Sequence, residues 1–568
     1  MQILSAAEMQ ACDRVTTERY GVASLDLMRA AAATVAAFAR EQFPRARRVT
    51  VLCGRGNNGG DGMMAARLLA DAGLAVTTLL LGAPGLLAGD GAVAWSELTS
   101  PMRGQVHVVT TAQDLDRLKA ALQTDLIVDA LVGTGFKPPL KGLALAALEW
   151  LRGSSAPVLA VDLPSGWPAD ATSASVEGPV FPADAVITFT APKPAHVFGQ
   201  LTRRWDQPVV VAPIGSPDAA IVSSLGLHWA GTAMELAQAP RAASANKGNF
   251  GHVLVVGGSV GKSGAPAMTS LAALRSGAGL VTAAVPAPLM ASVAAIAPEL
   301  MTWPLAASLA GNVSAESLAP EFEATSPQRK ANLTFVSQAQ IDSLTAGKTV
   351  LAIGPGLGQS PETVKFVTGF LSATKMPAVI DADALNILAA KPVLLAKLAK
   401  GRALVLTPHP GEMARLAGIP VAEVQANRLE VARSFAQRMG VTLVLKGART
   451  LIAHPDGKVA VNTTGNPGMA KGGSGDLLTG LVAGLMAQHP QETARAVEAA
   501  VYLHGLAGDF AVREADEHTL LATDSLQQLS LAFRYRAFHY PLGGRNGYVW
   551  LQGLRTALPE AVQREEAE

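Results

Sequence analysis

Two segments of the chain, residues 48–82 and 252–286, repeat one order of patterns, and this order limits the possible folds more than any other feature. Each segment contains an apolar run, a glycine-rich stretch, an alanine- and leucine-rich run of helical length, and a second apolar run. Continuous apolar strands that alternate with helices indicate a parallel sheet that helices cover on both faces. The sequence therefore predicts an α/β protein with two parallel-sheet domains, each of which begins with one of these segments.

The length of the chain agrees with two domains. Its 568 residues are too many for one ordinary hydrophobic core. Residues 216–245 show little hydrophobic periodicity, and we expect the linker there. The predicted domains are residues 1–225 and 226–534, and we expect that neither domain needs the tail at 535–568.

Composition excludes several classes of protein. An apolar content of 49% with a net charge of +1 is typical of a packed chain, and it argues against nucleic-acid binding, which needs clustered Lys and Arg. Cys12 and Cys53 lack metal-ligand spacing, which favours a reducing cytoplasm. The N-terminus does not resemble a signal peptide. Residues 276–298 carry no charge but contain glycines and prolines, which predicts a buried strand followed by a helix rather than a membrane span.

Residues 466–480, NPGMAKGGSGDLLTG, place a single acid, Asp476, in a glycine-rich turn before an apolar helical run. Backbone amides freed by glycine at a helix start can bind phosphate. An aspartate among them would repel phosphate unless it takes a proton from a hydroxyl during phosphoryl transfer. The alternative is a glycine turn between two helices with no ligand.

A second glycine-rich stretch, residues 54–59, satisfies the G-x-G-x-x-G pattern directly after a strand. The next strand ends without the acid that would bind the ribose of a dinucleotide, so a hydride-transferring site is disfavoured. Asn57, Asn58 and Asp61 lie in the same stretch and suggest a hard cation or a polar ligand near the backbone. Asparagines that only form the turn are the alternative.

Two further acids, Asp129 and Asp162, fall at the ends of predicted parallel strands. Ligands of open α/β sheets bind at those ends, although aspartate is also a frequent helix N-cap there. Acids after three strands of one sheet favour a ligand site.

The second domain contains two motifs that we interpret as a ligand loop. Residues 257–261 match G-x-S-x-G and residues 261–263 read GKS, but Val256 stands where a phosphate-binding P-loop needs glycine. Other predicted strands end in polar residues: glycines at 354–358, Asp381, Asp383, His409, Glu412 and Lys446. A lone histidine such as His409 is usually structural, but this convergence predicts a nucleotide-sized site.

The ordered motifs resemble those of fused NAD(P)H-hydrate repair enzymes over residues 3–530. The first half matches at LSAAEMQACDR, GRGNNGGDG, DALVGTG and DLPSG, and the second at NFGHVLVVGGSVGKSGAP, ALRSGAGL, GPGLG, IDADALN, TPHPGEMARL, LKGA and GNPGMAKGGSGDLLTG. The resemblance implies a Rossmann-like NAD(P)HX epimerase followed by a ribokinase-like, ADP- or ATP-dependent NAD(P)HX dehydratase. The chain departs from the family at LMRAAA, where LM-x-x-AG is usual, and at Asn246, where histidine is frequent.

The resemblance also implies the site residues. The substrate of the epimerase would meet Asn57, Asn58, Gly59, Gly60, Asp61, Gly133, Thr134, Gly135, Phe136, Lys137, Pro138, Pro139 and Asp162. Its K⁺ would bind Asn58, Asp129 and Ser165. The dehydratase substrate would meet Ala265, Gly356, His409 and Asp476, and the nucleotide Lys446, Gly447, Ala448, Arg449, Thr450 and Gly475. We expect Mg²⁺ with ADP or ATP, no nucleic-acid or membrane partner, and a homo-oligomer.

The implied chemistry repairs a hydrated nicotinamide. The first domain would interconvert the (6R) and (6S) epimers of NAD(P)HX, with Asp162 as the acid/base. The second would phosphorylate the C6 hydroxyl of the S epimer, with Asp476 as the base, and release NAD(P)H, phosphate and AMP or ADP. Two rivals are a ribokinase-type small-molecule kinase with a regulatory domain, and a non-catalytic or RNA-binding first domain. The phosphoryl donor, the preference for NADHX or NADPHX and the base of the epimerase stay open.

Overall fold

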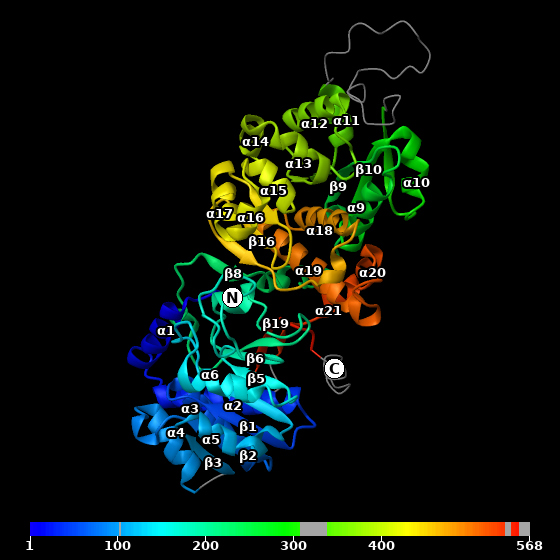
Figure 1. Ribbon diagram of the computed structural model, residues 1–568. Coiled ribbons are helices and arrows are strands. Elements are labelled where there is room, and N and C mark those ends of the chain that lie inside the picture. Colours follow the sequence, from blue (N-terminus) through cyan, green and yellow to red (C-terminus); the bar gives the residue numbers. More distant parts are fainter. Residues whose placement is uncertain (102–103, 307–337, 540–546, 556–568) are drawn as a thin grey trace, which may run out of the picture. The chain divides into compact units, whose positions relative to one another are not determined.

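The computed structural model describes residues 1–101, 104–306, 338–539 and 547–555, and the chain forms two compact units (Figure 1). The first unit comprises Met1–Trp229 with Arg536–Glu568, and the second comprises Ala230–Tyr535. The stretch 216–245, where a linker was expected, contains η3 (Asp218–Ala220), β8 (Leu227–Trp229), η4 (Ala230–Ala233) and α8 (Met234–Ala237).

The first unit contains a mostly parallel sheet in the order β18-β19-β7-β6-β5-β4-β1-β2-β3. Its strands are β1 (Arg48–Cys53), β2 (Ala75–Leu81), β3 (Gln105–Val109), β4 (Leu126–Ala130), β5 (Val158–Val161), β6 (Ala185–Phe189), β7 (Val209–Ala212), β18 (Phe538–His539) and β19 (Tyr548–Gln552). The strands from β3 to β7 are parallel, and their order reverses between β1 and β4, as in a Rossmann fold. The predicted Rossmann-like α/β class is therefore confirmed.

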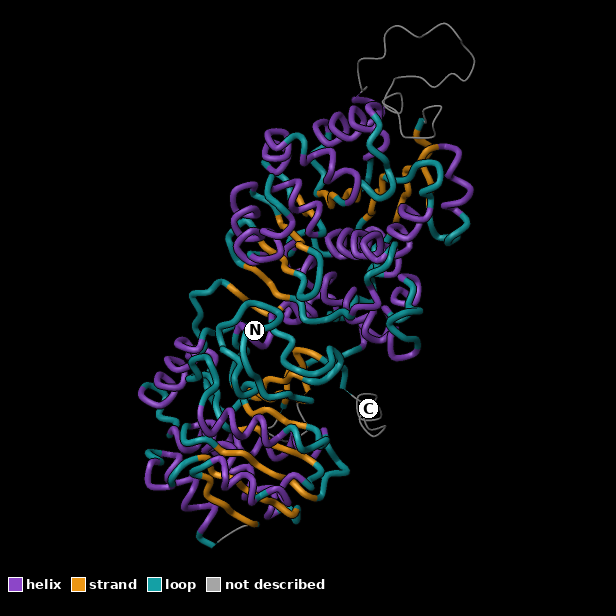
Figure 2. Tube along the Cα trace, viewed as in Figure 1, coloured by secondary structure: helices purple, strands orange, loops and turns teal. Residues whose placement is uncertain are grey.

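Helices cover both faces of this sheet (Figure 2). Val49, Val51 and Cys53 of β1 pack with α2 (Ser24–Gln42), α3 (Asn57–Asp71) and α4 (Asp90–Thr99). Leu52 points to the other face and packs with α5 (Ala112–Arg117) and α6 (Gly142–Leu151), because successive strand residues alternate between faces. The remaining helices of this unit are α1 (Ala6–Glu18), η1 (Pro84–Leu86), η2 (Lys119–Leu122) and α7 (Pro194–Phe198).

The tail contributes two strands, β18 and β19, to the first unit, whereas we expected from the sequence that neither domain needs the tail. β19 pairs antiparallel with β7, and β18 pairs with β19. Phe38 of α2 makes edge-to-face contacts with Tyr548 and Trp550, at ring-centroid distances of 5.3 and 6.2 Å. Both aromatic residues of β19 are buried. The tail therefore covers an edge of the sheet that would otherwise expose unpaired backbone groups.

The second unit contains a sheet in which β11-β10-β9-β12-β13-β14-β15 are parallel and β16 and β17 are antiparallel. Its strands are β9 (His252–Val256), β10 (Leu280–Pro286), β11 (Met301–Leu305), β12 (Val350–Ile353), β13 (Ala378–Ile380), β14 (Leu404–Leu406), β15 (Thr442–Leu445), β16 (Leu451–Ala453) and β17 (Val459–Val461). This unit has the expected ribokinase-like α/β class.

Its helices follow the predicted alternation with strands. They are η5 (Lys247–Phe250), α9 (Gly264–Arg275), η6 (Ala287–Leu289), α10 (Met290–Ala294), α11 (Gln338–Thr345), α12 (Pro361–Ala373), α13 (Ala382–Ala389), α14 (Pro392–Ala399), α15 (Pro410–Ala417), α16 (Val421–Ala426), α17 (Arg428–Met439), η8 (Pro467–Met469), α18 (Ser474–Gln488), α19 (Thr493–Glu514), α20 (Ala522–Gln527) and α21 (Leu529–Arg534). Residues 276–298 form β10 and α10, as predicted. Across the described ranges, no helix combines the length and apolarity needed to cross a membrane.

Two glycines of the glycine-rich stretches lie inside helices. α3 begins at Asn57, and a Cβ on Gly59 would collide with the carbonyl oxygen of Gly54. α18 begins at Ser474, and a Cβ on Gly480 would collide with the carbonyl oxygen of Thr269 in α9. Glycine is needed at both positions because a helix closely approaches another backbone segment there.

Candidate active sites

A cavity of about 1280 Å³ lies at the carboxyl ends of the strands of the first unit. Its wall includes eight of the predicted substrate residues: Asn57, Asn58, Asp61, Gly133, Thr134, Gly135, Phe136 and Asp162. The predicted residues Gly59, Gly60, Lys137, Pro138 and Pro139 are not part of this wall. Two glycine-rich segments that are distant in sequence therefore meet at one cavity.

Asp162 follows β5 and is fixed in the cavity wall by hydrogen bonds. The backbone N–H of Thr134 donates to its Oδ2 (3.0 Å), while Thr188 Oγ1 (2.9 Å) and Lys193 Nζ (2.9 Å) donate to its Oδ1. Its backbone has a φ of 65°, which is unusual for a residue other than glycine. Such a conformation persists only where the surroundings fix it, as these contacts do.

Lys193 and His196 are site residues that the sequence reasoning missed. Lys193 is only 2% exposed and lines the cavity after β6. The backbone N–H of Lys193 donates to His196 Nδ1 (3.0 Å), so Nε2 carries the ring proton and donates it to the carbonyl oxygen of Asp162 (2.7 Å). The only signal for this pair was a lysine and a histidine just beyond a strand end, in APKPAH.

The surroundings of Asp162 keep its carboxylate charged. Burial is the largest influence and would raise the pKa of Asp162, but the electrostatic effects of Lys193 and His196 and the hydrogen bonds from Lys193 and Thr188 together outweigh it, so the pKa lies below the ordinary value. Burial, followed by the charge of Lys193, lowers the pKa of His196 to about 4, so this ring is neutral at pH 7. The carboxylate is therefore ready to accept a proton.

Of the three predicted cation ligands, Asn58 lies in the cavity wall near Asp162, whereas Asp129 and Ser165 contact each other and are not part of this wall. Ser165 donates to Asp129 from its backbone N–H (2.8 Å) and its hydroxyl (2.6 Å), and burial raises the pKa of Asp129 to about 6. Asn58 is 9% exposed, and neither atom of its amide has a hydrogen-bond partner among the described residues. A Cβ on Gly133 would touch both Asn58 and Asp162, so these two residues flank one glycine.

In the second unit, Asp476 lies in the first turn of α18, after Gly473 with a φ of 93°. Burial and the nearby charge of Asp381 raise the pKa of Asp476 to about 6, while Lys446 acts in the opposite direction. Within the described ranges, no hydrogen bond reaches its carboxylate. A partly buried carboxylate with a pKa near neutrality is suited to general-base catalysis.

Lys446 connects this acid to the predicted nucleotide residues. Its Nζ lies 3.0 Å from Asp381 Oδ1, and a Cβ on Gly475 would lie 3.5 Å from the same Nζ. Asp381 also accepts hydrogen bonds from the hydroxyls of Thr407 and Thr479, both at 2.8 Å. In the sequence, Asp381 was recognised as a polar residue at a strand end, but it was not among the predicted site residues.

The other predicted dehydratase residues belong to tight local contacts. His409 is the N-cap of α15, and its Nδ1 accepts a hydrogen bond from the backbone N–H of Gly411 (3.0 Å). Gly356 has a φ of 68°, and a Cβ there would lie 3.2 Å from the side chain of Ala265. Ala265 and Gly356 are therefore neighbours, as a shared substrate contact requires.

The glycine-rich loop before α18 is anchored by a residue that the sequence did not single out. Asp509 of α19 accepts hydrogen bonds from the backbone N–H of Gly465 and the amide of Asn466, both at 3.0 Å. Two predicted nucleotide residues lie in the loop between β15 and β16. Arg449 donates a hydrogen bond to the carbonyl oxygen of Thr463 (3.1 Å), and the hydroxyl of Thr450 donates one to the carbonyl oxygen of Gly447 (2.8 Å).

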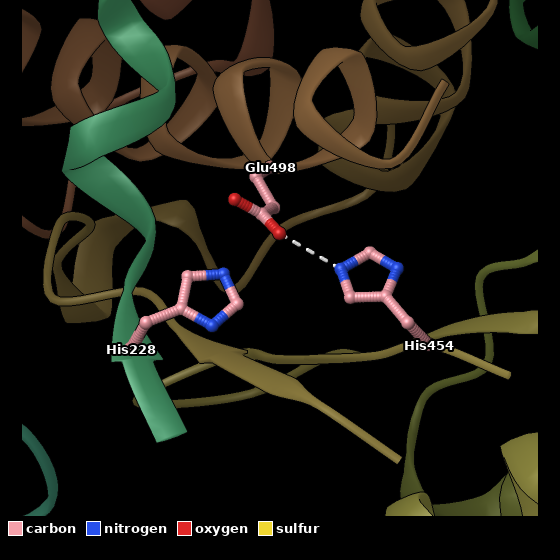
Figure 3. A group of neighbouring side chains, drawn as sticks. All are labelled: His228, His454 and Glu498. Carbon is pink, nitrogen blue, oxygen red and sulfur yellow. Dashed lines mark hydrogen bonds and ion pairs between the residues drawn. The ribbon is translucent and has the colours of Figure 1, made fainter. Parts of the chain in front are cut away.

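A buried pair lies elsewhere in the second unit. His454 follows β16, and its Nε2 lies 2.8 Å from Oε1 of Glu498 on α19 (Figure 3). Both residues are buried. This hydrogen-bonded histidine and carboxylate link the end of β16 to α19.

The chain is similar to known proteins over almost its whole length. Residues 253–530 match the family described as NAD(P)H-hydrate dehydratase, and residues 24–195 match the family described as YjeF-related protein N-terminus. Bifunctional NAD(P)H-hydrate repair enzymes of Moorella thermoacetica and Escherichia coli are 40% and 33% identical, with 94% and 92% of this chain and 97% and 92% of theirs covered.

A solved structure is similar to one part of the chain. The ADP/ATP-dependent NAD(P)H-hydrate dehydratase of Bacillus subtilis, co-crystallised with ATP and Mg²⁺, is 31% identical with a TM-score of 0.42 and covers 53% of this chain and 96% of its own. The full-length relatives decide the family, because they include both matched regions. The chain belongs to the bifunctional NAD(P)H-hydrate repair enzymes and has NAD(P)H-hydrate epimerase and ADP/ATP-dependent NAD(P)H-hydrate dehydratase activities.

Proposed function

We propose that epimerisation takes place in the cavity of the first unit, with Asp162 as an acid–base group at C6 of NAD(P)HX. The observation that carries this assignment is the fixed position of Asp162 in the cavity wall, where Lys193, Thr188 and Thr134 bind its carboxylate. C6 carries both nitrogen and oxygen, so its configuration is lost when either bond breaks. A charged, oriented carboxylate can accept the proton that this step releases.

We assign a potassium ion to the three predicted cation ligands of this unit. Asn58, Asp129 and Ser165 supply amide, carboxylate and hydroxyl oxygens, which are the ligands that hard cations prefer. The unpartnered amide of Asn58 supports a ligand at this position. The ion would supply positive charge that orients the substrate, while the chain itself keeps Asp162 in place.

We propose that the second unit dehydrates the S epimer, with Asp476 as the general base. Asp476 would take the proton of the C6 hydroxyl as this oxygen attacks the terminal phosphorus of ADP or ATP. The phosphate then leaves with the electron pair of the C6–O bond while the lone pair of the ring nitrogen forms a C6=N1 bond. Loss of a proton from C5 to water then forms the C5=C6 double bond of NAD(P)H. The N–H groups at the start of α18 would stabilise the negative charge on the transferring phosphoryl group.

Several contacts support the assignment of the remaining residues. Lys446, which lies beside Gly475, would bind the nucleotide together with residues 447–450. Ala265 and Gly356 would contact the substrate, and His409 would do so by the exposed side of its ring. Mg²⁺ is expected to arrive with the nucleotide and to balance its charge. We further propose a homo-oligomer in the cytoplasm, with residues 1–225 as the epimerase and 226–534 as the dehydratase.

A coupled assay tests these assignments. The full chain is mixed with (6R)- and (6S)-NADHX and either ADP or ATP, and recovery of NADH is followed by absorbance while the epimers are separated by chromatography. We expect complete recovery of NADH from both epimers with one nucleotide consumed per NADH. A ribokinase-type kinase would instead consume nucleotide without forming NADH, and that result would contradict the proposal.

A further inference from the structure

Helix α1 forms part of the cavity wall of the first unit. Six of its residues line the cavity at the spacing of one helix face: Met9, Gln10, Asp13, Arg14, Thr17 and Glu18. The start of the helix is fixed, because Ser5 and Glu8 form a capping box and Glu8 also accepts hydrogen bonds from Ser224 (2.7 Å). The position of this face relative to the cavity is therefore set by the fold.

Asp13 is the acid on this face with an unusual environment. Its Oδ1 is buried and has no hydrogen-bond partner among the described residues. A buried carboxylate without a partner is unfavourable, whereas a neutral carboxylic acid is tolerated. Burial raises the pKa of Asp13 to about 6; Lys193 opposes this shift and Asp162 adds to it. Asp13 therefore carries a proton in a larger fraction of molecules near neutral pH than an ordinary aspartate does.

Other groups in the cavity wall indicate that it is built for a polar ligand. Asn58 is nine-tenths buried, and its amide has no partner in the part of the chain that the structure describes. Asp61 of α3 lines the same cavity, and burial, then the charges of Asp162 and Asp13, raise its pKa well above the ordinary value. The titratable or charged groups around Asp13 are thus Asp61, Asp162 and Lys193, with Cys12 beside it on α1.

We propose that Asp13 is a second catalytic residue of the epimerase cavity, which acts as the acid when Asp162 acts as the base. This inference rests on the proposed assignment of epimerisation to the cavity. Asp13 lies within the motif LSAAEMQACDR, but the resemblance gives it no role, and the predicted substrate residues do not include it. Two carboxyl groups in one cavity, one with a raised pKa and one whose pKa lies below its ordinary value, form a pair that can divide the acid and base roles at a single carbon.

The proton balance of the reaction uses both groups. Asp13 gives its proton to the C6 hydroxyl, the C6–O bond breaks, and its electron pair leaves with the new water. The lone pair of the ring nitrogen forms a C6=N1 bond. A water molecule then adds to the opposite face of C6 and gives a proton to Asp162. Afterwards, solvent returns the proton from Asp162 to Asp13, and the two groups exchange roles for the other epimer.

Epimerisation by the full chain without nucleotide tests this role, because the dehydratase is then inactive. We expect Asp13→Asn to lower kcat about 10²-fold while KM stays within about threefold of wild type. Formate should restore part of the rate of Asp13→Ala by replacing the missing acid. Epimerisation in H₂¹⁸O should place the isotope on C6 of the inverted product, since the C6–O bond breaks.

Control variants and a control activity distinguish a specific loss of the Asp13 acid from other causes of a low epimerisation rate. Asp26→Asn removes an exposed acid from the adjacent helix α2 and should keep the wild-type rate. Thermal unfolding of each Asp13 variant shows whether the first unit is folded, and dehydration of (6S)-NADHX with ADP or ATP by the same protein shows that the second unit is intact. Asp13→Glu should keep more activity than Asp13→Asn. If wild type does not epimerise, the proposed function fails rather than this inference.

Three outcomes would overturn the role of Asp13. They are a kcat for Asp13→Asn within threefold of wild type, a loss confined to KM, and no response of Asp13→Ala to formate. Retention of ¹⁶O in the inverted epimer would overturn the C6–O step. A large loss in Asp61→Asn beside a normal Asp13→Asn would assign the acid to Asp61 instead.

Discussion

The two proposed catalytic aspartates differ in how their surroundings control the charge of the carboxylate. Asp162 accepts hydrogen bonds from Thr134, Thr188 and Lys193, and its pKa lies below the ordinary value. The carboxylate of Asp476 accepts no hydrogen bond from the described residues, and burial raises its pKa to about 6. A lysine lies near each acid, but only Lys193 donates directly to its aspartate, whereas Lys446 donates to Asp381.

This difference matches the two tasks. A carboxylate that is fixed by three donors is ready to accept a proton from a substrate that diffuses into a preformed cavity. A carboxylate without donors keeps its lone pairs for the substrate hydroxyl, and its raised pKa makes it a stronger base once it is ionised. The same residue type is thus adapted to two reactions by its neighbours alone.

The largest expected effect is the loss of the base in the second unit. Asp476→Asn should lower the dehydration rate roughly 10²- to 10⁴-fold, or about 3 to 5 kcal/mol of barrier, because the hydroxyl proton has no acceptor. Epimerisation should be unaffected. Recovery of NADH from (6S)-NADHX within threefold of wild type would contradict the role of Asp476.

Asp162→Ala should produce the reverse pattern. Dehydration of the S epimer should continue at the wild-type rate, while the R epimer persists and disappears only at its spontaneous rate. Chromatography of both epimers over time measures this. Complete consumption of both epimers well above the spontaneous rate would falsify the division of labour between the two aspartates.

The two lysines offer a sharper comparison. Lys193→Met removes a cation that lowers the pKa of Asp162 and a donor that fixes its carboxylate, so the anion is less favoured and less well oriented, and epimerisation at pH 7 should fall. The rate should recover as pH rises. Lys193→Arg is the control, because it keeps the charge. A pH profile of Lys193→Met equal to that of wild type would show that the cation does not set the charge of Asp162.

The smallest expected effect is the difference in pH dependence of the wild-type protein. The base form of Asp476 increases as pH rises through about 6, so dehydration should increase across this range and become constant above it. Asp162 has a pKa below its ordinary value and stays ionised over the same pH range, so the epimerisation rate should not rise with pH because of this residue. In Asp476→Asn, the residual dehydration rate should no longer rise through pH 6. If the dehydration rate of this variant still rises near pH 6, another group and not Asp476 causes the rise.

The sequence predicted both parallel sheets because a parallel strand is buried on both faces and is therefore a continuous apolar run. It also predicted the carboxyl-end acids, since Asp129 and Asp162 directly follow such runs, and the Asp476 loop, since glycines mark a close approach of backbones. The motif resemblance then decided the family. These signals are local, so one sequence is sufficient to read them.

Only the tertiary structure identified Lys193, Asp13 and the strand β19. Lys193 and Asp13 lie on elements far from Asp162 in sequence, and a lone charged residue carries no signal of the cavity that it faces. β19 is a strand only because β7, more than 300 residues earlier, offers an unpaired edge and Phe38 offers an aromatic contact. The residue types determined which local structures could form, and long-range packing decided which side chains meet and which charges they carry.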